Sequence, residues 1–515
     1  MASHSTRELS KCGLGSNSVP TESSTHLNRP SRGHAEYSVT ISEQEPALSA
    51  DSSPGTRNVN REGFWRGVVA SASSPAVSAS SKSTGGPAVS EAVIVGGGLG
   101  GLATAIGLRN IGIDAQVYEA RDEVIDGGTL LTLFPNGLRA LSRIDPAIVP
   151  QLISRGVPDP TCFNRSPTGD ILFQFDPASS ITARYGFPML CIRWQEVLDV
   201  LRGMLPNDSI HLGHRLVEFT QREEEKEGGG GAEGNGSVKC VFKEVSGGEE
   251  RLMEVETPLL LGADGIHSEV RKKLLLVGGK EGQTPSARTL LGRTAAIIDG
   301  GLGKLYWALT LVDSADPTVS SARSSGGEEA REKILRAFEG WDAVEQLVKA
   351  TPPDLILERR VLDLPPLPFW VHGRTALLGD AAHAVTPVTG QGANLAFEDA
   401  AQLVECLRVH SHASDALRSF QSIRMPRVQA VTSRNVAEAN KLYDKKGKNE
   451  KKAGGYVKEA GYRDASKAGA APPILKDVEA TVVSAAQEAR DPDDNIYGYD
   501  IVAREEELCI ASVMQ

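Results

Sequence analysis

The fold is decided by the stretch "EAVIVGGGLGGLATAIGLRNIGIDAQVYEA", residues 91–120. Apolar residues fill positions 92–95 and dominate positions 115–118, which predicts two short buried strands. Between them, apolar side chains at helical spacing from residue 99 to about residue 110 predict a helix. The stretch therefore predicts one βαβ unit.

The turn between the first strand and the helix carries glycines in the order G-x-G-x-x-G, at Gly96, Gly98 and Gly101. The first allows a tight turn, the second lets a pyrophosphate approach the backbone, and the third lets the helix pack closely on the strand. The pyrophosphate would face the unpaired N–H groups of the helix N-terminus. Glu119 ends the second strand, where its carboxylate can accept hydrogen bonds from a ribose diol. The pattern predicts a dinucleotide site and leaves NAD and FAD both open.

A second stretch, "LLLGADGIHSEVRKKL" at residues 259–274, runs an apolar strand into Asp264 and Gly265 before a polar helix start. Taken alone, it fits equally well an ordinary strand, turn and helix in which Ser268 caps the helix N-terminus.

A third stretch, "LLGDAAHAVTPVTGQGANLAFEDA" at residues 377–400, repeats this order on a larger scale. A predicted strand over 375–378 leads into Asp380, then into a loop rich in Pro and Gly, and then into a helix over 393–403. Asp380 and His383, three residues apart, raise the question of an acid/base or metal site. Three elements of this kind in one chain predict a nucleotide cofactor more strongly than one.

Length and composition indicate a globular protein of two or more domains. The chain has 515 residues, of which 40% are hydrophobic and 23% charged, with a formal net charge of −11. No apolar run approaches the about 20 residues that span a bilayer, so no transmembrane segment is expected. The negative charge argues against nucleic acid as the main partner. The six cysteines lack CxxC spacing, which predicts a reducing compartment and no metal site.

With these motifs the sequence resembles the group A flavoprotein monooxygenases, which share the fold of p-hydroxybenzoate hydroxylase and include zeaxanthin epoxidase and salicylate-hydroxylase-like enzymes. The resemblance is carried by the three stretches above and by "GGTLLTLFPNGLRAL", and it covers roughly residues 92–440. It implies an α/β fold, with a Rossmann-like FAD-binding domain and an interleaved α+β substrate domain built on a mixed sheet.

The resemblance also implies FAD as the cofactor and a role for each motif. The glycine turn would cradle the pyrophosphate, Glu119 would bind the adenosine ribose, and Asp380 would bind a ribityl hydroxyl. Pro387 would lie beside the isoalloxazine ring, and the backbone N–H groups of Ala393 and Asn394 would face its N1/C2 carbonyl. The implied cofactor-binding residues are Gly96, Gly98, Leu99, Gly100, Gly101, Glu119, Arg193, Asp264, Gly265, Asp380, Pro387, Gly390, Gly392, Ala393 and Asn394.

Some of these assignments carry more than one interpretation. In the family, the Asp264–Gly265 motif lies near the FAD pyrophosphate and ribityl chain and is linked to NAD(P)H use. Arg193 either contacts the flavin chain or is a surface arginine that caps an amphipathic helix. His383 is interpreted as a packed residue of its loop, so that it and Asp380 form no catalytic pair.

The reaction implied by the resemblance uses NADH or NADPH to reduce FAD. The reduced flavin then reacts with O2 to give a C4a-hydroperoxide, which passes one oxygen atom to a small organic substrate. The flavin carries this chemistry, so no catalytic side chain and no metal is expected. Three interpretations stay open, namely a monooxygenase that hydroxylates an aromatic ring or epoxidises an alkene, a reductase or dehydrogenase without oxygen insertion, and a non-catalytic flavin-binding remnant.

The expected domain organisation is interleaved along the chain. Residues 1–88, rich in Ser, Thr, Gly and Pro, are expected to be a disordered extension or a plastid transit peptide, which predicts a plastid or cytoplasmic and not a secreted protein. A flexible hairpin insertion is expected at 222–236, and the tail stretch "DDNIYGYDIV" is expected to dock back on the protein. The predicted parts are residues 89–160, 186–270 and 372–440 for the FAD-binding domain, 161–185 and 271–371 for the substrate domain, and 441–515 for a polar C-terminal extension.

The substrate region is expected to place a sheet over the flavin. Residues 305–313 alternate as a strand in which Tyr306 and Trp307 are either core aromatics or substrate contacts. The stretch 275–304 is short for the family and lacks its aromatic and arginine strand. Incomplete cover of the flavin, with loss of peroxide to solvent, is the expected consequence.

Overall fold

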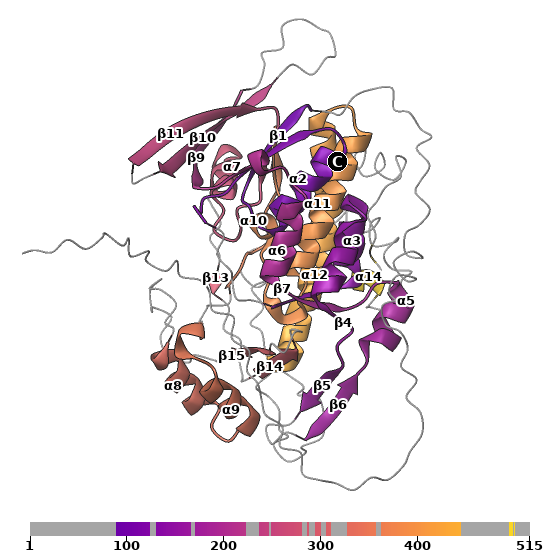
Figure 1. The fold of residues 1–515 in the computed structure, drawn as a ribbon. Helices are drawn as coiled ribbons and strands as arrows, with labels where there is room; N and C mark the ends of the chain where they lie inside the picture. Colours follow the sequence, from indigo (N-terminus) through magenta and orange to yellow (C-terminus); the bar gives the residue numbers. More distant parts are fainter. Residues whose placement is uncertain are drawn as a thin grey trace, which may run out of the picture. The chain divides into compact units, whose positions relative to one another are not determined.

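The structure is a computed structural model of the whole chain (Figure 1). It describes residues 89–123, 130–165, 170–222, 236–246, 249–280, 286–287, 294–299, 305–310, 327–356, 362–443, 494–497 and 499. The contacts divide the chain into Met1–Tyr37 and Ser38–Gln515, and every described residue belongs to the second unit. The predictions for residues 1–88, for the insertion at 223–235 and for most of the C-terminal extension lie outside the described residues.

A six-stranded sheet forms the centre of the fold, in the order β17-β18-β12-β1-β2-β8. All neighbouring strands are parallel except β17, which is antiparallel to β18. The strands predicted from the three motifs are therefore confirmed and lie next to one another. Their bounds are β1 (Glu91–Val95), β2 (Asp114–Tyr118), β8 (Ile210–His211), β12 (Leu260–Gly262), β17 (Val371–His372) and β18 (Thr375–Leu377).

The register of this sheet aligns the ends of three motif strands. Val95 of β1 pairs with Gly262 of β12, and Gly262 pairs with Leu377 of β18. Because parallel strands end at one edge of a sheet, the chain leaves all three at the same edge. Residues separated by almost 300 positions are thus brought together by backbone pairing alone.

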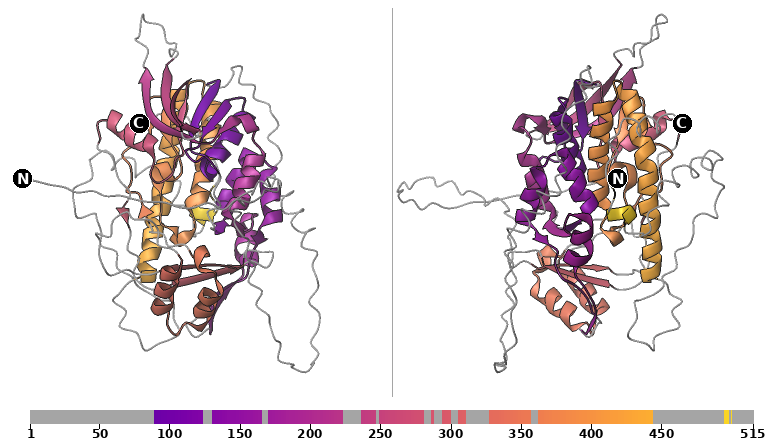
Figure 2. Two further views of the ribbon diagram at one scale, coloured as in Figure 1. Left: turned by 60° about the vertical axis from the view of Figure 1, so that its left-hand side comes forward. Right: turned by 90° about the vertical axis from the view of Figure 1, so that its right-hand side faces the viewer.

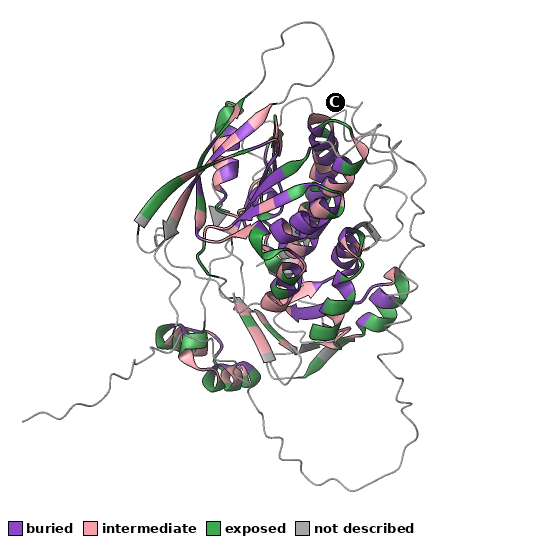
Figure 3. Cartoon of the chain, turned by 45° about the horizontal axis from the view of Figure 1, so that its top comes forward, coloured by how far each residue is buried: buried purple, intermediate pink, exposed green. Residues whose placement is uncertain are grey.

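Helices pack against this sheet and against one another (Figures 1 and 2). Helix α11 contacts α2, α3 and α12, and most of its residues are buried (Figure 3). Its approach to α2 requires Gly107, where a Cβ would lie 2.6 Å from Val404 Cγ2. The helices are α2 (Leu99–Asn110), α3 (Pro135–Ile144), α4 (Ile148–Arg155), α6 (Trp194–Gly203), α7 (Glu269–Val277), α10 (Asp380–His383), α11 (Gly392–Val409) and α12 (Ala413–Tyr443).

The structure contains two further sheets of three strands each. The first has the order β11-β10-β9 and is antiparallel, as expected for a hairpin around the insertion at 222–236. The second has the order β3-β7-β4 and joins the segment after β2 to the strand before α6. Their strands are β9 (His214–Arg222), β10 (Ser237–Ser246), β11 (Glu249–Thr257), β3 (Leu130–Leu133), β4 (Val157–Pro158) and β7 (Leu190–Arg193).

The predicted substrate region contains short strand pairs and two helices. Within its described residues, three antiparallel pairs occur, β5–β6, β13–β16 and β14–β15. The mixed sheet that was expected to join these pairs is not seen among the described residues, and it stays a prediction. The elements are β5 (Cys162–Arg165), β6 (Ile171–Phe175), η1 (Ala178–Thr182), α5 (Ala183–Tyr185), β13 (Ser286–Ala287), β14 (Thr294–Asp299), β15 (Leu305–Thr310), α8 (Glu328–Ala337), α9 (Asp342–Ala350), η3 (Pro353–Leu355) and β16 (Leu362–Asp363).

Trp307 is a core aromatic of this region. It packs against the buried cluster formed by α8 and α9, and its indole N–H donates to Thr351 Oγ1 at 3.0 Å. The strand predicted over 305–313 is confirmed for Leu305–Thr310, and the remainder lies outside the described residues. Strand β14, between residues 275 and 304, contains neither an aromatic residue nor an arginine.

We predict that Gly101→Ala destabilises the fold, whereas Gly203→Ala does not. A Cβ at Gly101 would lie 2.1 Å from the carbonyl oxygen of Gly96, so α2 would have to move away from β1. Overpacking of this kind costs about 1–3 kcal/mol in the free energy of unfolding. Gly203, at the end of α6, has no described atom within 4 Å of its Cβ position. Alanine there should leave the stability unchanged or raise it by up to about 1 kcal/mol.

Urea denaturation of both variants measures the difference, with the slope of the transition used to confirm that both unfold in the same way. Equal midpoints for Gly101→Ala and Gly203→Ala would contradict the close packing of α2 on β1.

Candidate functional site

The glycine turn after β1 separates into positions that the protein fills and one that it leaves open. Gly96 has φ +112°, and a Cβ there would lie 2.3 Å from Ala263 O. Gly101 meets Gly96 O in the same way. At Gly98, by contrast, a Cβ would meet no atom of the described chain within 4 Å. The first and third glycines therefore serve internal packing, and the second leaves space for a ligand at the backbone.

The start of α2 is suited to an anion. Leu102 is the first residue whose N–H donates within the helix, to Gly98 O at 3.0 Å. The N–H groups of Leu99, Gly100 and Gly101 consequently have no intrahelical acceptor, and the first turn has no acidic residue. These observations fit a pyrophosphate at this position.

Glu119 is held beside this turn by its own carboxylate. Oε2 accepts the N–H of Gly97 at 2.8 Å, and Oε1 accepts the N–H of Arg121 at 3.0 Å. A carboxylate fixed in this way retains lone pairs that can accept hydrogen bonds from a ribose diol. The βαβ unit therefore fits the predicted dinucleotide.

Asp264 caps helix α7. Its carboxylate accepts the Ser268 hydroxyl at 2.5 Å and the N–H groups of Glu269 and Val270 at 2.7 and 3.2 Å. Ser268 is the N-cap residue, as expected, and accepts the N–H of Arg271 at 2.9 Å. Burial raises the pKa of the Asp264 carboxyl, and these hydrogen bonds oppose the rise. The geometry thus gives Asp264 a capping role, while its contact with FAD stays a prediction, as does that of Gly265.

Arg271 links the second and third motifs and was not predicted. Its side chain is fully buried, and its Nη1 and Nη2 atoms donate to Ala381 O at 2.9 Å and to Ile266 O at 2.6 Å. Its positive charge lies near the Asp380 carboxyl. In the sequence, Arg271 precedes two lysines in a polar helix start, so nothing distinguishes it from surface cations.

Asp380 is recessed but accessible. It begins α10 after Gly379, whose φ is +58°, and the residue retains exposed surface. Burial nevertheless raises the pKa of the Asp380 carboxyl, against the lowering effect of His383 and Arg271. A carboxylate in such a position can accept a hydrogen bond from a ligand hydroxyl, as predicted.

Asn394 locks the start of α11 to the β3–α3 turn. Its Oδ1 accepts the N–H of Phe134 at 2.9 Å, and its Nδ2 donates to Thr132 O at 3.1 Å and to Gly390 O at 2.9 Å. A Cβ at Gly137 would lie 2.1 Å from Asn394 Oδ1, so only glycine fits there.

The backbone at the start of α11 points donors away from the helix. Leu395 is the first residue whose N–H donates to the preceding turn, to Gln391 O at 2.8 Å. The N–H groups of Gly392, Ala393 and Asn394 therefore lack an intrahelical acceptor, which fits the predicted contact with the flavin. Pro387, in η4 (Pro387–Thr389), is exposed just before this point.

Arg193 is a partly buried residue at the junction of β7 and α6. It is the last residue of β7, its side chain is 17% exposed, and its Nη1 lies 3.8 Å from Glu196 Oε1. It begins α6 through its backbone, without a side-chain cap. The predicted apolar face of α6 is confirmed, since Val197, Leu198 and Leu201 are buried.

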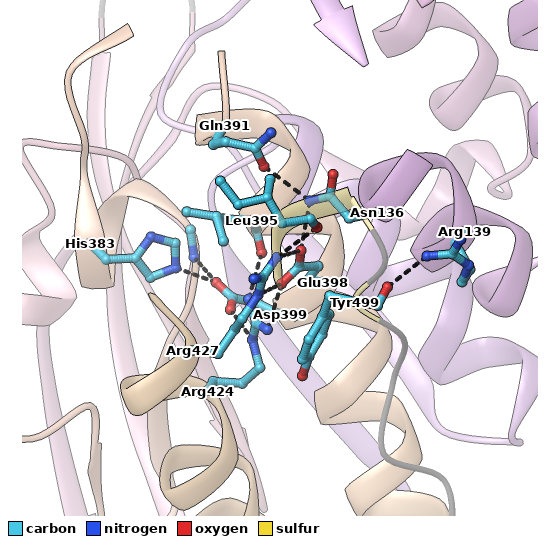
Figure 4. A network of polar contacts seen from close by, with 12 residues as sticks. Asn136, Arg139, His383, Gln391, Leu395, Glu398, Asp399, Arg424, Arg427 and Tyr499 are labelled. Atoms are coloured by element: carbon cyan, nitrogen blue, oxygen red, sulfur yellow. Dashed lines mark hydrogen bonds and ion pairs between the residues drawn. The ribbon is translucent and has the colours of Figure 1, made fainter. Parts of the chain in front are cut away.

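A buried ionic network joins α11 to α12 (Figure 4). Glu398 and Asp399 of α11 are fully buried. Arg424 binds Glu398 Oε2 at 2.7 Å and Asp399 Oδ1 at 2.8 Å, and Arg427 binds Glu398 Oε1 at 2.7 Å. Burial acts to raise the pKa of the Glu398 carboxyl, but the two guanidinium groups outweigh it and hold that pKa below its ordinary value.

His383 belongs to this network and is not paired with Asp380. Its Nε2 lies 2.5 Å from Asp399 Oδ2, which also accepts the N–H of Gly379 at 2.9 Å. His383 is therefore a packed residue, as interpreted, that fastens α10 to α11. On the other side, Asn136 Nδ2 donates to Glu398 Oε1 at 2.7 Å and to Gln391 Oε1 at 3.0 Å.

The network was missed in the sequence, although one signal was present. Glu398 and Asp399 are adjacent in the apolar helix "ANLAFEDAAQL", so they cannot both lie on its solvent-exposed face. A carboxylate that is buried requires a cation beside it. Which arginines supply the charge depends on the packing of α12 and could not be read from the pattern.

Two absences concern the described part of the chain. No group of three or more His, Cys, Asp or Glu side chains is placed there to hold a metal ion. None of its helices combines the length and the apolar character needed to cross a membrane.

Comparison with known proteins shows what this chain is similar to. A family model described as "FAD binding domain" matches residues 368–435. The aurachin C monooxygenase/isomerase of Stigmatella aurantiaca is 28% identical over 65% of this chain and 85% of its own length. The FAD-dependent urate hydroxylase of Klebsiella oxytoca is 28% identical over 66% of this chain and 87% of its own length. By these matches the chain is similar to the group A FAD-dependent monooxygenases.

Further relatives and solved structures are of the same kind. A chloroplastic zeaxanthin epoxidase from an Oncidium hybrid cultivar is 28% identical over 68% of this chain, which spans 52% of that longer protein. Klebsiella pneumoniae HpxO, solved with FAD and uric acid, superposes with a TM-score of 0.56 at 24% identity, over 68% of this chain and 88% of its own. A salicylate hydroxylase substrate complex gives 0.55 at 20% identity, over 83% and 98%. These structures show the same fold.

We predict that the ionic network makes the fold sensitive to acid. The pKa values of Glu398 and Asp399 are lowered from 4.5 and 3.8 in the folded protein. The unfolded chain therefore takes up protons first as the pH falls, and stability that is present at neutral pH is lost below these ordinary values.

Asp399→Asn should be less stable at pH 7, and its stability should fall less steeply between about pH 5 and pH 3, by up to about 1.4 kcal/mol per pH unit. Urea denaturation at a series of pH values measures the slope. Glu332→Gln on the surface of α8 serves as the control and should follow the unmodified chain. Parallel curves for Asp399→Asn and the unmodified chain would show that the network does not carry the effect.

Proposed function

We propose that this chain is an FAD- and NAD(P)H-dependent monooxygenase that inserts one oxygen atom from O2 into an aromatic or unsaturated organic substrate. The observation that supports it most is the arrangement at one edge of the central sheet. There the glycine turn after β1, the capped turn after β12 and Asp380 after β18 follow three adjacent parallel strands. The FAD-binding domain match and the FAD complexes of similar structures support FAD as the ligand.

In this proposal each backbone element binds a different part of FAD. The N–H groups of Leu99 to Gly101 bind the pyrophosphate, since they are unpaired within α2 and lie at the positive end of its dipole. Glu119 accepts the ribose hydroxyls, and Asp380 accepts a ribityl hydroxyl. When bound, the flavin would supply electron transfer from the nicotinamide and activation of O2.

The start of α11 would supply electrostatic stabilisation. Reduction of a flavin places negative charge at its N1–C2 carbonyl region, and the N–H groups of Ala393 and Asn394 would face that charge. Donors fixed in advance cost no reorganisation when the charge appears. The Asn394 side chain contributes by holding these N–H groups in place through Phe134 and Gly390.

The substrate class is proposed from the relatives together with the sequence. Two of the relatives are named for their substrates, the purine urate and the carotenoid zeaxanthin. One similar solved structure is a substrate complex of salicylate hydroxylase. We therefore propose an unsaturated or aromatic ring compound as the substrate. Residues 161–185 and 271–371 are proposed to enclose it, and the absence of the aromatic and arginine strand from β14 favours a loosely covered site.

The test is a measurement of flavin content and oxygen consumption on the purified chain. We expect a yellow protein with bound FAD, oxidation of NADH or NADPH, and O2 uptake that yields hydroxylated or epoxidised product from a panel of phenolic acids, purines and carotenoids. A colourless protein that gains no flavin absorbance with added FAD would disprove the proposal. NAD(P)H oxidation by another acceptor without O2 uptake would indicate a dehydrogenase, and stoichiometric H2O2 without product would indicate a remnant.

We predict that Gly98→Ala separates cofactor binding from folding. Gly98 has φ −78°, which alanine adopts without strain, and its Cβ position is free of described protein atoms. The methyl group would instead occupy the space that a pyrophosphate needs. FAD affinity should fall by about tenfold or more, corresponding to about 1.4 kcal/mol, with little change in the urea midpoint of the apoprotein.

Quenching of FAD fluorescence measures the affinity, and Gly203→Ala, which is remote from the turn, is the matched control. Unchanged FAD affinity in Gly98→Ala would place the pyrophosphate elsewhere while leaving the fold as described.

A further inference from the structure

The C-terminal part of the chain returns to the FAD-binding domain, as expected from the sequence. Helix α14 (Asp494–Tyr497) contacts α3, and Ile496 is buried in the main hydrophobic core with 4% of its surface exposed. We call Ile496, Tyr497 and Tyr499 the C-terminal strap.

Tyr497 packs on the turn that leads into α3. Its ring stacks on Phe134 with centroids 5.1 Å apart and meets Tyr185 edge-on at 5.7 Å. Arg139 of α3 fastens the backbone at this point, because Nη1 donates to Tyr497 O at 3.1 Å and to Tyr499 O at 2.8 Å. Its Nη2 donates to Tyr185 O at 3.0 Å. One guanidinium thus joins the strap to two other segments.

Tyr499 packs on the cations of the buried ionic network (Figure 4). The Arg427 guanidinium carbon lies 4.3 Å from the centroid of the Tyr499 ring, and that of Arg424 lies 5.4 Å from it. Arg427 Nη2 also donates to Ile496 O at 3.2 Å. The ring covers the faces of two arginines that already bind Glu398 and Asp399, so it excludes water from that ion cluster and strengthens its interactions.

Both contacts lead to the start of α11. Phe134, under Tyr497, donates its N–H to Asn394 Oδ1, and its ring would lie 3.2 Å from a Cβ at Gly390. Arg427, under Tyr499, binds Glu398, which accepts Asn136 Nδ2, and Asn136 also donates to Gln391. The strap therefore packs against Phe134 and Arg427, which belong to the two sets of side-chain contacts that hold residues 390–394.

We propose that Tyr497 and Tyr499 are positioning residues for the flavin, which act by holding the N–H groups at the start of α11 through Phe134 and Arg427. This inference rests on the proposed function, because those N–H groups matter for catalysis only if they face a flavin. Loss of either ring loosens residues 390–394. The central sheet keeps its strands, because neither tyrosine is part of that sheet.

The test compares Tyr497→Ala and Tyr499→Ala with Tyr497→Phe and Tyr499→Phe in the full-length chain. The alanine variants should bind FAD about tenfold more weakly, and at saturating FAD the visible circular dichroism of the flavin should differ from that of the unmodified chain. The phenylalanine variants keep the rings and should restore both properties. Trp341→Ala is the matched control, since Trp341 forms an aromatic pair with Phe338 at the same 5.1 Å in the separate α8–α9 cluster. It should leave FAD affinity and the flavin spectrum unchanged.

Hydrogen exchange of residues 389–394 in the chain without FAD provides a second measurement that does not need the cofactor. Exchange should be about tenfold faster in the alanine variants than in the unmodified chain and in Trp341→Ala. If the unmodified chain binds no FAD, the proposed function fails, and exchange alone decides whether the strap holds the loop. If the alanine variants match the unmodified chain in exchange, FAD affinity and flavin circular dichroism, the strap has no positioning role.

Discussion

Two adjacent carboxylates buried on α11 determine how that helix is held against its neighbours. Glu398 and Asp399 lie inside the protein, where an unpaired charge would cost several kcal/mol, so cations must reach them from other elements. Arg424 and Arg427 do so from α12, and the His383 ring adds a hydrogen bond to Asp399 from α10. Because all three partners must be in place at once, the ionic cluster sets the position of α11 against its neighbours. The same contacts therefore also position the start of α11, where the first N–H groups have no acceptor within the helix.

The second constraint is close packing around glycine at the edge of the central sheet. β1, β12 and β18 end side by side. Gly96 lies too close to Ala263 of the turn after β12 for a methyl group, and Gly101 lies too close to Gly96. Gly137 allows the same closeness between α3 and Asn394. Backbone pairing brings the motifs to one edge, and the missing side chains let them approach. Among the glycines of the turn after β1, Gly98 alone has no described atom within 4 Å of its Cβ position, which is the property expected of a ligand-facing position.

The sequence predicted the local features well because each depends on residues close in the chain. The βαβ unit, the Ser268 cap and the apolar face of α6 follow from spacing and capping chemistry within one or two turns. Arg271 and the partners of Glu398 could not be predicted, since their roles depend on elements more than 25 residues away that meet only in the fold. The interpretation of His383 as a packed residue that forms no catalytic pair with Asp380 is confirmed, whereas its partner, Asp399, was not predicted. Docking of the tail was expected from the stretch "DDNIYGYDIV", whereas its position over Phe134 and Arg427 was not.

The strand order of the central sheet has a consequence for synthesis of the chain. β1 lies between β2 and β12, so one of its edges stays without its native neighbour until Leu260 has been made, 165 residues after Val95. At about 5–20 residues per second, translation leaves that edge unpaired for roughly 10–30 seconds. An unpaired parallel strand is a site for wrong association, and a nascent chain of this topology would benefit from a chaperone during that interval. The strap residues emerge after every other described element, and they can therefore dock only on a site whose sheet and helices are already assembled.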